Sequence, residues 1–322
     1  MPLRVFPALI IAVAALAGCA STDRLASVKG PQVAHHQHLI SPGFAALVQH
    51  DPLDAASLLR MMDDAGAERA VILSMGYSFA DERKQLADPE RKVRAENDWT
   101  AVQVAAAPER LRGFCSVNPL SPGALAEVER CNRLPGMKGL KLHFGNSGVD
   151  LHKADHVARM RAVFALANRL AVPVVVHLRA RSGTPYGSVE ARLFLNELVP
   201  LAPDVTIQIA HLAGSGPGHS ADADAALLVF VEAIRDRDPR VRRLVFDVTT
   251  VASEEASPEE RALVAARLRQ LGMKRIVFGS DMPIAGNPDL ARAWSLFRAK
   301  LPLTSAEFDQ IAKNVAPYMR ER

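Results

Sequence analysis

Histidine and aspartate side chains stand where several short apolar runs of the sequence end. His36 and His38 close VAHHQH, His177 follows PVVV, His211 follows VTIQIA and Asp281 follows RIVFGS. Imidazole and carboxylate groups are usual ligands of Zn²⁺, and a catalytic site needs ligands that converge rigidly from distant segments. One histidine of this kind is more often a core or surface residue. Four such endings together predict a metal site.

The histidines of the first run fall on two faces if that run is a strand, because side chains alternate with a period of two. His36 and His38 then share one face, while His35 and Gln37 share the other. We therefore expect His36 and His38 to act together and His35 to be a packing residue.

Short apolar runs alternate with amphipathic stretches along the chain from Val33 onward. Such alternation favours parallel strands with crossover helices, and eight units over about 250 residues favour closure into a barrel. The predicted fold class is α/β, a single-domain (β/α)8 TIM barrel with an outer C-terminal helix over about 304–318. Chemistry in such barrels lies at the C-terminal ends of the strands, where all the candidate ligands stand. The predicted strands are 32–38, 69–75, 111–117, 138–143, 173–178, 205–211, 242–248 and 275–280.

Helix boundaries also carry recognisable signals. Ser257 and Thr304 each precede a glutamate by three residues, which is the pattern of an N-terminal capping box. Gly272 is placed to end the helix that begins after Ser257.

The composition is that of a globular protein with one large core, and it argues against nucleic acid as a partner. The chain has 322 residues, of which 49% are hydrophobic and 23% charged, with a formal net charge of +4. The basic residues are scattered among acids and only 5% of residues are aromatic, so there is no basic aromatic surface to predict.

The N-terminus reads as a leader and not as part of the barrel. An apolar stretch from Phe6 to Ala17 suits a signal peptide and is too short to span a bilayer comfortably. Leu16-Ala-Gly-Cys19 resembles the lipobox of bacterial lipoproteins, which implies cleavage before Cys19 and its lipidation. Ala20 follows Cys19, where lipoproteins kept in the inner membrane typically carry Asp, so the resemblance favours anchoring in the outer membrane, facing the periplasm. The predicted domains are a signal peptide (1–18), a tether (19–31) and the barrel (32–322).

Cys115 lies in a predicted strand and Cys131 in a predicted helix. Two cysteines in a large domain do not make a disulfide framework. We interpret both as small buried apolar side chains, and the sequence leaves open whether they are bonded.

The motifs in order resemble the amidohydrolase superfamily, in particular its branch of metal-dependent barrels that includes nonoxidative decarboxylases and lactone hydrolases. The matching strings are HHQHL, GLKLHFG, VVVHLR, QIAHLAG and FGSDMP. The resemblance implies that His36, His38 and His177 are metal ligands, that Asp281 is a ligand that also handles a proton, and that His211 is a ligand or a polarising acid. It implies one divalent ion, Zn²⁺ or alternatively Mn²⁺. Family members often carry Asp or Glu ahead of the first motif, where this chain has Ala34 and His35.

Lys141 admits two interpretations. It shares strand parity with His143 and points into the barrel, where a lysine is costly unless neutralised or paired. Relatives with two metals carry a carboxylated lysine on strand four, and GLKLH resembles those strings. The other interpretation makes Lys141 a cation that holds a substrate carboxylate or the Asp281 network. We favour one metal.

The resemblance predicts a hydrolase of a small ester, lactone or amide, possibly carboxylated. Asp281 would serve as general base and acid, and His211 would stabilise the oxyanion. A decarboxylase of the same branch and a non-catalytic envelope barrel are the alternatives, and a homodimer is possible. Arg179, Lys141 and His143 are predicted to bind substrate, with Tyr77, Asn118 and Asp247 as further groups at strand ends.

Overall fold

Eight parallel strands form a single barrel in the computed structural model, which describes residues 30–320. Each strand pairs with its neighbour in chain order. The seam between the last strand and the first is joined by backbone hydrogen bonds from His35 N to Phe278 O (2.7 Å) and from Asp281 N to His36 O (3.0 Å). The predicted barrel is confirmed. The strands are β1 (Val33–Gln37), β2 (Arg69–Leu73), β3 (Leu111–Ser116), β4 (Met137–His143), β5 (Val174–His177), β6 (Ile207–Ile209), β7 (Leu244–Asp247) and β8 (Ile276–Val277).

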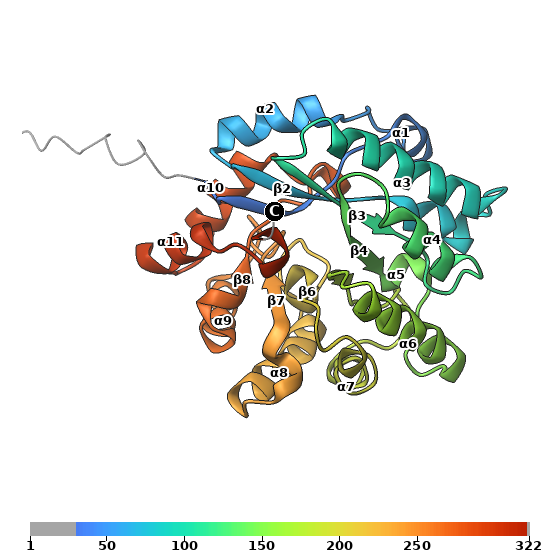
Figure 1. Cartoon of the computed structure of the whole chain (residues 1–322). Coiled ribbons are helices and arrows are strands. Elements are labelled where there is room, and N and C mark those ends of the chain that lie inside the picture. The colour runs from blue at the N-terminus through green and yellow to red at the C-terminus, as the bar shows by residue number, and fades with distance from the viewer. Residues whose placement is uncertain (1–29, 321–322) are drawn as a thin grey trace, which may run out of the picture.

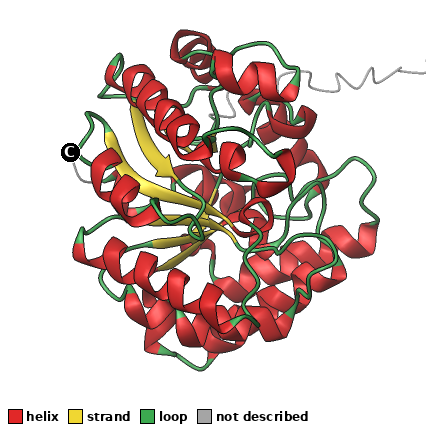
Figure 2. Ribbon diagram, turned by 90° about the vertical axis from the view of Figure 1, so that its right-hand side faces the viewer, coloured by secondary structure: helices red, strands yellow, loops and turns green. Residues whose placement is uncertain are grey.

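Helices surround the ring of strands, and the segment after α11 covers the end of the barrel at which the strands begin, which we call its floor (Figure 1). Figure 2 shows the strands enclosed by helices. Among the described residues, no helix is both long and apolar enough to cross a membrane. The α-helices are α1 (Pro42–Val48), α2 (Ala55–Ala65), α3 (Pro89–Ala105), α4 (Ala124–Cys131), α5 (Phe144–Ser147), α6 (Ala154–Arg169), α7 (Ser188–Glu197), α8 (Ala221–Arg235), α9 (Pro258–Leu271), α10 (Leu290–Lys300) and α11 (Ser305–Lys313).

The predicted helix boundaries hold where side chains cap them. Thr304 and Glu307 form a complete capping box at the start of α11, and Ser257 Oγ accepts from Glu260 N at the start of α9. Helix α9 ends before Gly272, as expected. The predicted C-terminal helix is too long, because α11 stops at Lys313 and the chain then turns under the barrel.

Two layers of apolar side chains stabilise the barrel. The larger layer fills the space between strands and helices. The smaller one lies inside the ring, where Val71, Phe114 and Val175 meet Tyr318 and Met319 from the C-terminal segment. Phe114 and Val175 are fully buried, so the interior is packed as a core and not open as a pore.

Cys115 of β3 and Cys131 of α4 form a disulfide. Both residues are fully buried, as the sequence indicated, and the bond answers the question that the sequence left open. The bond ties a barrel strand to the helix that follows it.

Removing this disulfide should destabilise the fold. The crosslink closes a loop between residues 16 apart, and chain entropy assigns about 3 kcal/mol to a loop of that size. We expect the Cys115→Ala, Cys131→Ala variant to lose a stability of this order in urea unfolding. An unchanged unfolding midpoint and slope would contradict this expectation.

Glu96 of α3 is a buried carboxyl that supplies a second stability test. Its Oε2 accepts from Ser41 Oγ at 2.5 Å, whereas Oε1 is buried without a partner. Burial raises the pKa of Glu96 to about 7, so the folded protein keeps a proton that the unfolded chain releases. Stability should therefore fall as pH rises from about 4.5 to 7.

The Glu96→Gln variant should lack this fall and exceed the wild type at pH 8 by about 3 kcal/mol, the free-energy equivalent of the pKa shift. Urea unfolding of both proteins between pH 4.5 and pH 8 checks this. Parallel stability profiles would show that Glu96 is not protonated in the fold.

Candidate metal centre

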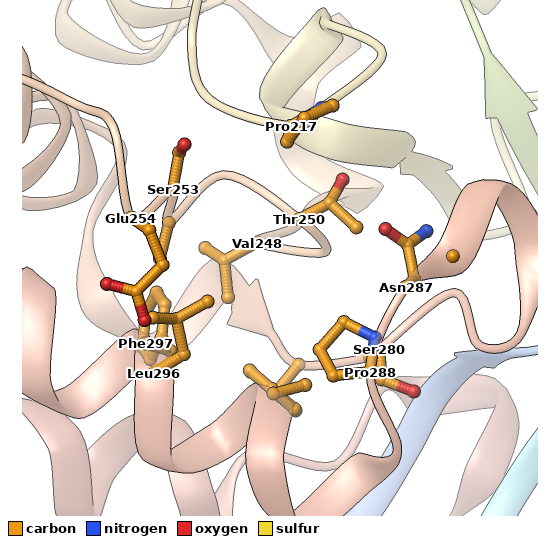
Figure 3. Close-up of a pocket in the computed structure, with 15 residues that line it drawn as sticks. Pro217, Val248, Thr250, Ser253, Glu254, Ser280, Asn287, Pro288, Leu296 and Phe297 are labelled. Atoms are coloured by element: carbon orange, nitrogen blue, oxygen red, sulfur yellow. The ribbon is translucent and has the colours of Figure 1, made fainter.

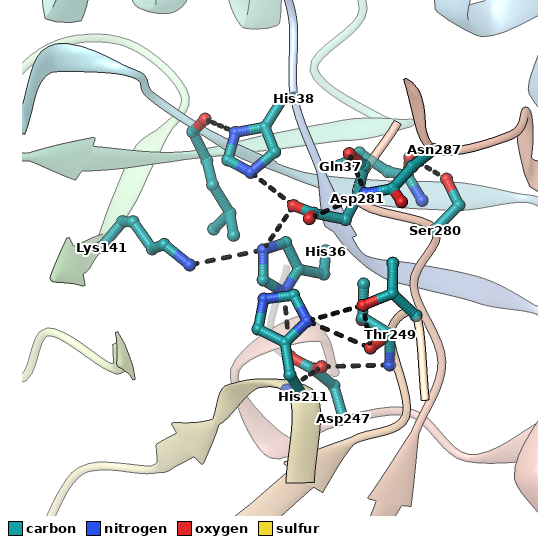
Figure 4. A network of polar contacts seen from close by, with 12 residues as sticks. His36, Gln37, His38, Lys141, His211, Asp247, Thr249, Ser280, Asp281 and Asn287 are labelled. Carbon is teal, nitrogen blue, oxygen red and sulfur yellow. Dashed lines mark hydrogen bonds and ion pairs between the residues drawn. The ribbon is translucent and has the colours of Figure 1, made fainter. Parts of the chain in front are cut away.

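Three of the predicted ligands meet where β1 and β8 end (Figure 4). His36 Nε2 lies 3.2 Å from Asp281 Oδ1, and His38 Nε2 lies 3.0 Å from the same oxygen. The close approach depends on Gly279, since a Cβ there would lie 2.5 Å from the His36 Cβ and 2.7 Å from its backbone nitrogen. A glycine in FGSD thus lets the end of β8 press against β1.

His211 joins this group from the other side of the barrel. Ligand atoms of His36, His211 and Asp281 all lie within 4.8 Å of one another, and all three residues are buried. His211 has a left-handed backbone, with φ of 53°, and so has Asp281, with φ of 58°. Such conformations of non-glycine residues cost roughly 1–3 kcal/mol each and are characteristic of functional sites.

Hydrogen bonds fix the tautomer of three histidines. His36 Nδ1 contacts Asp247 Oδ2 at 3.0 Å, His38 Nδ1 contacts Leu73 O at 2.7 Å, and His211 Nδ1 contacts Thr249 O at 3.0 Å. Carboxylate and carbonyl oxygens only accept, so each neutral ring carries its proton on Nδ1. In their neutral forms His36 and His38 therefore direct their Nε2 lone pairs at Asp281 Oδ1, an arrangement that a cation would stabilise.

The electrostatics of the site agree with this donor set. Burial lowers the pKa of His211 to about 4 and that of His38 below its usual value, so these two rings stay neutral. Burial and Lys141 also lower the pKa of His36, but Asp247 and Asp281 outweigh them and raise it above the usual value, so a metal ion would displace a proton from this ring. Burial alone would raise the pKa of Asp281, but His36 and His38 hold it well below the usual range. Neutral imidazoles and an ionised carboxylate are the forms that bind metal. The residues present fit a divalent ion.

Asp247, at the end of β7, accepts hydrogen bonds from four donors around the candidate metal centre. Besides His36, its carboxylate accepts from Gln208 Nε2 (2.7 Å), His211 N (2.8 Å) and Thr249 N (3.2 Å). It is fully buried. Asp247, expected from the sequence as a group at a strand end, is thus placed to orient His36. Gln208 was not singled out from the sequence, although an amide inside an apolar strand was a signal for it.

Lys141 lies among the ligand atoms. Its Nζ is 3.3 Å from His36 Nε2, and the residue is 1% exposed. Burial lowers its pKa to about 8, so the amine loses its proton more readily than an exposed lysine does. This location is compatible with both interpretations made from the sequence.

His143 and His177 form a second pair of rings beside the first cluster. They stack with centroids 3.9 Å apart, and His177 lies 5.1 Å from the ring of His211. His143 Nδ1 accepts from Asn146 N, so the neutral ring carries its proton on Nε2 and is a donor there. Burial lowers the pKa of both histidines well below the usual value. His177 Nε2 is 3.3 Å from Ser215 Oγ.

The other predicted groups stand farther out. Arg179 pairs with Asp222 at 2.5 Å and lies over the Tyr186 ring, although its Nη1 is buried without a partner. The Tyr77 ring is 4.9 Å from His143. Asn118 bonds to the backbone of Ala80 and Leu120, which is a loop-supporting role.

A cavity of about 230 Å³ is lined largely by the loops that follow β7 and β8, and none of the candidate ligands lines it (Figure 3). Its wall includes Asn287, whose Nδ2 bonds to Asp281 Oδ2 (3.1 Å), and Thr250, whose Oγ1 is 3.2 Å from His211 Nδ1. Neither residue was identified from the sequence, because both lie in loops after the last strands.

The family model described as amidohydrolase matches residues 33–316. The chain belongs to the amidohydrolase family. This membership makes it an enzyme of the amidohydrolase superfamily and removes the alternative of a non-catalytic barrel. No curated protein matches the chain.

Solved structures of low sequence identity share the fold. 5-Carboxyvanillate decarboxylase from Sphingomonas paucimobilis is 16% identical, with a TM-score of 0.62 over 91% of this chain and 99% of that one. A protein from Acinetobacter baumannii described as a 2-pyrone-4,6-dicarboxylic acid hydrolase, with citric acid bound, is 15% identical (0.58; 87% and 96%). An amidohydrolase from Burkholderia multivorans with bound Zn is 14% identical (0.55; 87% and 95%).

Replacing the carboxylate that orients His36 should weaken metal binding. In Asp247→Asn, one carboxylate oxygen becomes an NH₂ group, which cannot accept from the donors that Asp247 binds. The NH₂ would face either the His36 Nδ1 proton or one of the other donors. Loss of such an outer partner typically costs 10–100-fold in metal affinity. Zn²⁺ competition with a chromogenic chelator measures this, and Asp224→Asn, a carboxylate bonded to Arg267, is the control. Equal affinity of the Asp247→Asn variant and the wild type would contradict the assigned role.

Proposed function

We propose that the chain is a metal-dependent hydrolase of a small ester, lactone or amide. The observation that supports this most is the convergence of the Nε2 atoms of His36 and His38 on Asp281 Oδ1, at 3.2 and 3.0 Å. We assign one divalent ion, Zn²⁺ or Mn²⁺, to His36, His38, His177 and Asp281. His211 is added to these ligands, because its Nε2 is an acceptor and lies in the same cluster.

The residues around the ion divide the chemistry between them. A bound divalent ion would lower the pKa of its water to about 7 and polarise the attacked carbonyl. Asp281 would take the proton of the attacking water and deliver it to the leaving group, and Asn287 holds its Oδ2 in place. Neutral His211 has no proton on Nε2 to donate to an oxyanion, so this part of its expected role passes to His143, whose Nε2–H is free to donate.

A carboxylated substrate agrees with the cations of the site. Lys141 and the unpartnered Nη1 of Arg179 are the groups to bind a carboxylate. The same observation favours the second candidate, a decarboxylase, in which Lys141 would hold the carboxylate beside the ion. Carboxylation of Lys141, with a second ion, is the alternative for the centre itself.

We also propose that the enzyme is exported and anchored in the bacterial envelope through lipid on Cys19. Cys19 lies outside the described residues. The buried disulfide supports the proposal, because such bonds persist in oxidising compartments and are rare in the cytosol. Mass spectrometry of the membrane fraction should find lipid on Cys19, and a soluble chain with an intact leader would contradict anchoring. The homodimer remains a prediction.

Metal content and turnover test the proposed function together. The protein is purified without chelator, analysed for metals, and assayed on p-nitrophenyl esters, small lactones and hydroxybenzoic acids. We expect one ion per chain and ester or lactone hydrolysis, both lost in the His36→Ala, His38→Ala variant. The control is His50→Ala, an exposed histidine outside the cluster.

Each other outcome has a distinct meaning. Release of carbon dioxide from the acids, without hydrolysis of any ester or lactone, would replace the hydrolase by the decarboxylase. Two ions per chain would favour carboxylated Lys141. A wild-type chain that takes up neither Zn²⁺ nor Mn²⁺ would overturn the metal assignment.

A further inference from the structure

The C-terminal segment Asn314–Arg320 is built into the floor of the barrel. After α11 the chain turns toward the middle of the ring of strands, and the described residues reach Arg320 (Figure 1). Asn314 Nδ2 donates to Ile276 O (2.6 Å), and Ala316 N donates to His35 Nε2 (3.1 Å). The segment is therefore attached to the beginning of β8 and to β1, on the side of the barrel opposite the metal centre.

Arginines of two further strands hold the same segment. Arg69 at the start of β2 donates to Met319 O, and Arg112 near the start of β3 donates to Tyr318 O. The early end of α11 has a separate cause, because Pro317 has no N–H to donate to Lys313 O and disfavours helical backbone at the residue before it.

Tyr318 of this segment contacts residues inside the barrel. Its ring packs edge-on against Phe114, with centroids 5.3 Å apart, and its hydroxyl donates to Gln208 Oε1. Tyr318 is buried, and burial raises its pKa well above the usual value, so the hydroxyl keeps its proton and remains a donor.

The bond from Tyr318 fixes the orientation of the Gln208 amide. With Oε1 toward the hydroxyl, Nε2 faces two acceptors, Asp247 Oδ2 at 2.7 Å and His35 O at 3.3 Å. The flipped amide would place its oxygen against both acceptors and its NH₂ against the hydroxyl donor. Asp247 Oδ2 in turn accepts from His36 Nδ1.

We propose that Tyr318 is a positioning residue of the metal centre, acting through Gln208 and Asp247 on the tautomer and orientation of His36. The inference rests on the proposed metal-dependent function, to which it adds a requirement for the C-terminal segment. Tyr318 donates to Gln208 and Gln208 donates to Asp247, while His36 donates to the same oxygen of Asp247 from the other side. The first two bonds are linked in series, and such bonds polarise one another in a buried environment.

A set of variants in the full chain tests whether Tyr318 positions His36 or whether the C-terminal segment only fills the end of the barrel. Tyr318→Phe keeps the ring and removes only the hydroxyl, and Gln208→Met keeps the length and removes the amide. Arg69→Gln is the matched control, since it loosens the same segment at Met319 without touching the chain to His36. Each protein is examined for Zn²⁺ affinity by chelator competition, for the visible spectrum of its Co²⁺ form, and for thermal unfolding without metal.

We expect Gln208→Met to lose about 10-fold in Zn²⁺ affinity, the lower end for an outer partner of a ligand, and Tyr318→Phe to lose less. The double variant should match Gln208→Met alone, because the two residues act in series. The Co²⁺ spectrum should change in both variants, whereas Arg69→Gln should lower only thermal stability.

Wild-type affinity and an unchanged Co²⁺ spectrum in Tyr318→Phe would overturn the inference and reduce the segment to a plug, leaving the proposed function intact. A wild-type chain without metal affinity would overturn the proposed function instead. The inference is then decided by nitrogen NMR of the histidines in the metal-free protein, where the wild type should show a proton on His36 Nδ1 and Tyr318→Phe should show its loss or exchange. Identical spectra would contradict it.

Discussion

The carboxylate of Asp247 is the constraint on which the centre depends. It is fully buried, and a buried charge costs several kcal/mol unless donors surround it. The required donors come from β1, β6 and the turns after β6 and β7. Satisfying one charge therefore brings together the parts of the chain that carry His36 and His211, and it holds the pKa of Asp247 well below the usual range despite burial.

The closed barrel makes this arrangement possible. Bonds across the seam between β8 and β1 place Asp281 beside His36, and Gly279 allows the approach. The left-handed backbone at His211 and Asp281 is held by hydrogen bonds from His211 N to Asp247 Oδ1 and from Asp281 N to His36 O. Rigid strands thus carry the ligands, while the loops after β7 and β8 supply Thr250 and Asn287 to the neighbouring cavity.

Much of this organisation could be predicted from the sequence, because it depends on local pattern. Apolar runs that alternate with amphipathic stretches predicted the barrel. The runs that end in His36, His177, His211 and Asp281 separately predicted that ligands stand at the strand ends. The capping box at Thr304 likewise predicted where α11 begins. These features follow from the period of a strand and from helix chemistry within a few residues.

The rest depends on contacts between distant segments, which no local pattern contains. The pairing of Cys115 with Cys131 and the bond of Tyr318 to Gln208 require the fold to be known. The donor and acceptor roles of His143 and His211 follow from Asn146 N and Thr249 O, so the expected oxyanion role of His211 could not be tested before the hydrogen bonds were known.

Anomalous diffraction at the zinc absorption edge, from crystals of the wild-type protein grown with Zn²⁺, tests the central claim most directly. We expect one strong peak within about 2.0–2.2 Å of the Nε2 atoms of His36 and His38 and of an Asp281 oxygen, the bonding distances of zinc to nitrogen and oxygen. Nδ1 of His36 should remain on Asp247. A peak elsewhere, or none between these three side chains, would contradict the claim that the centre holds a metal.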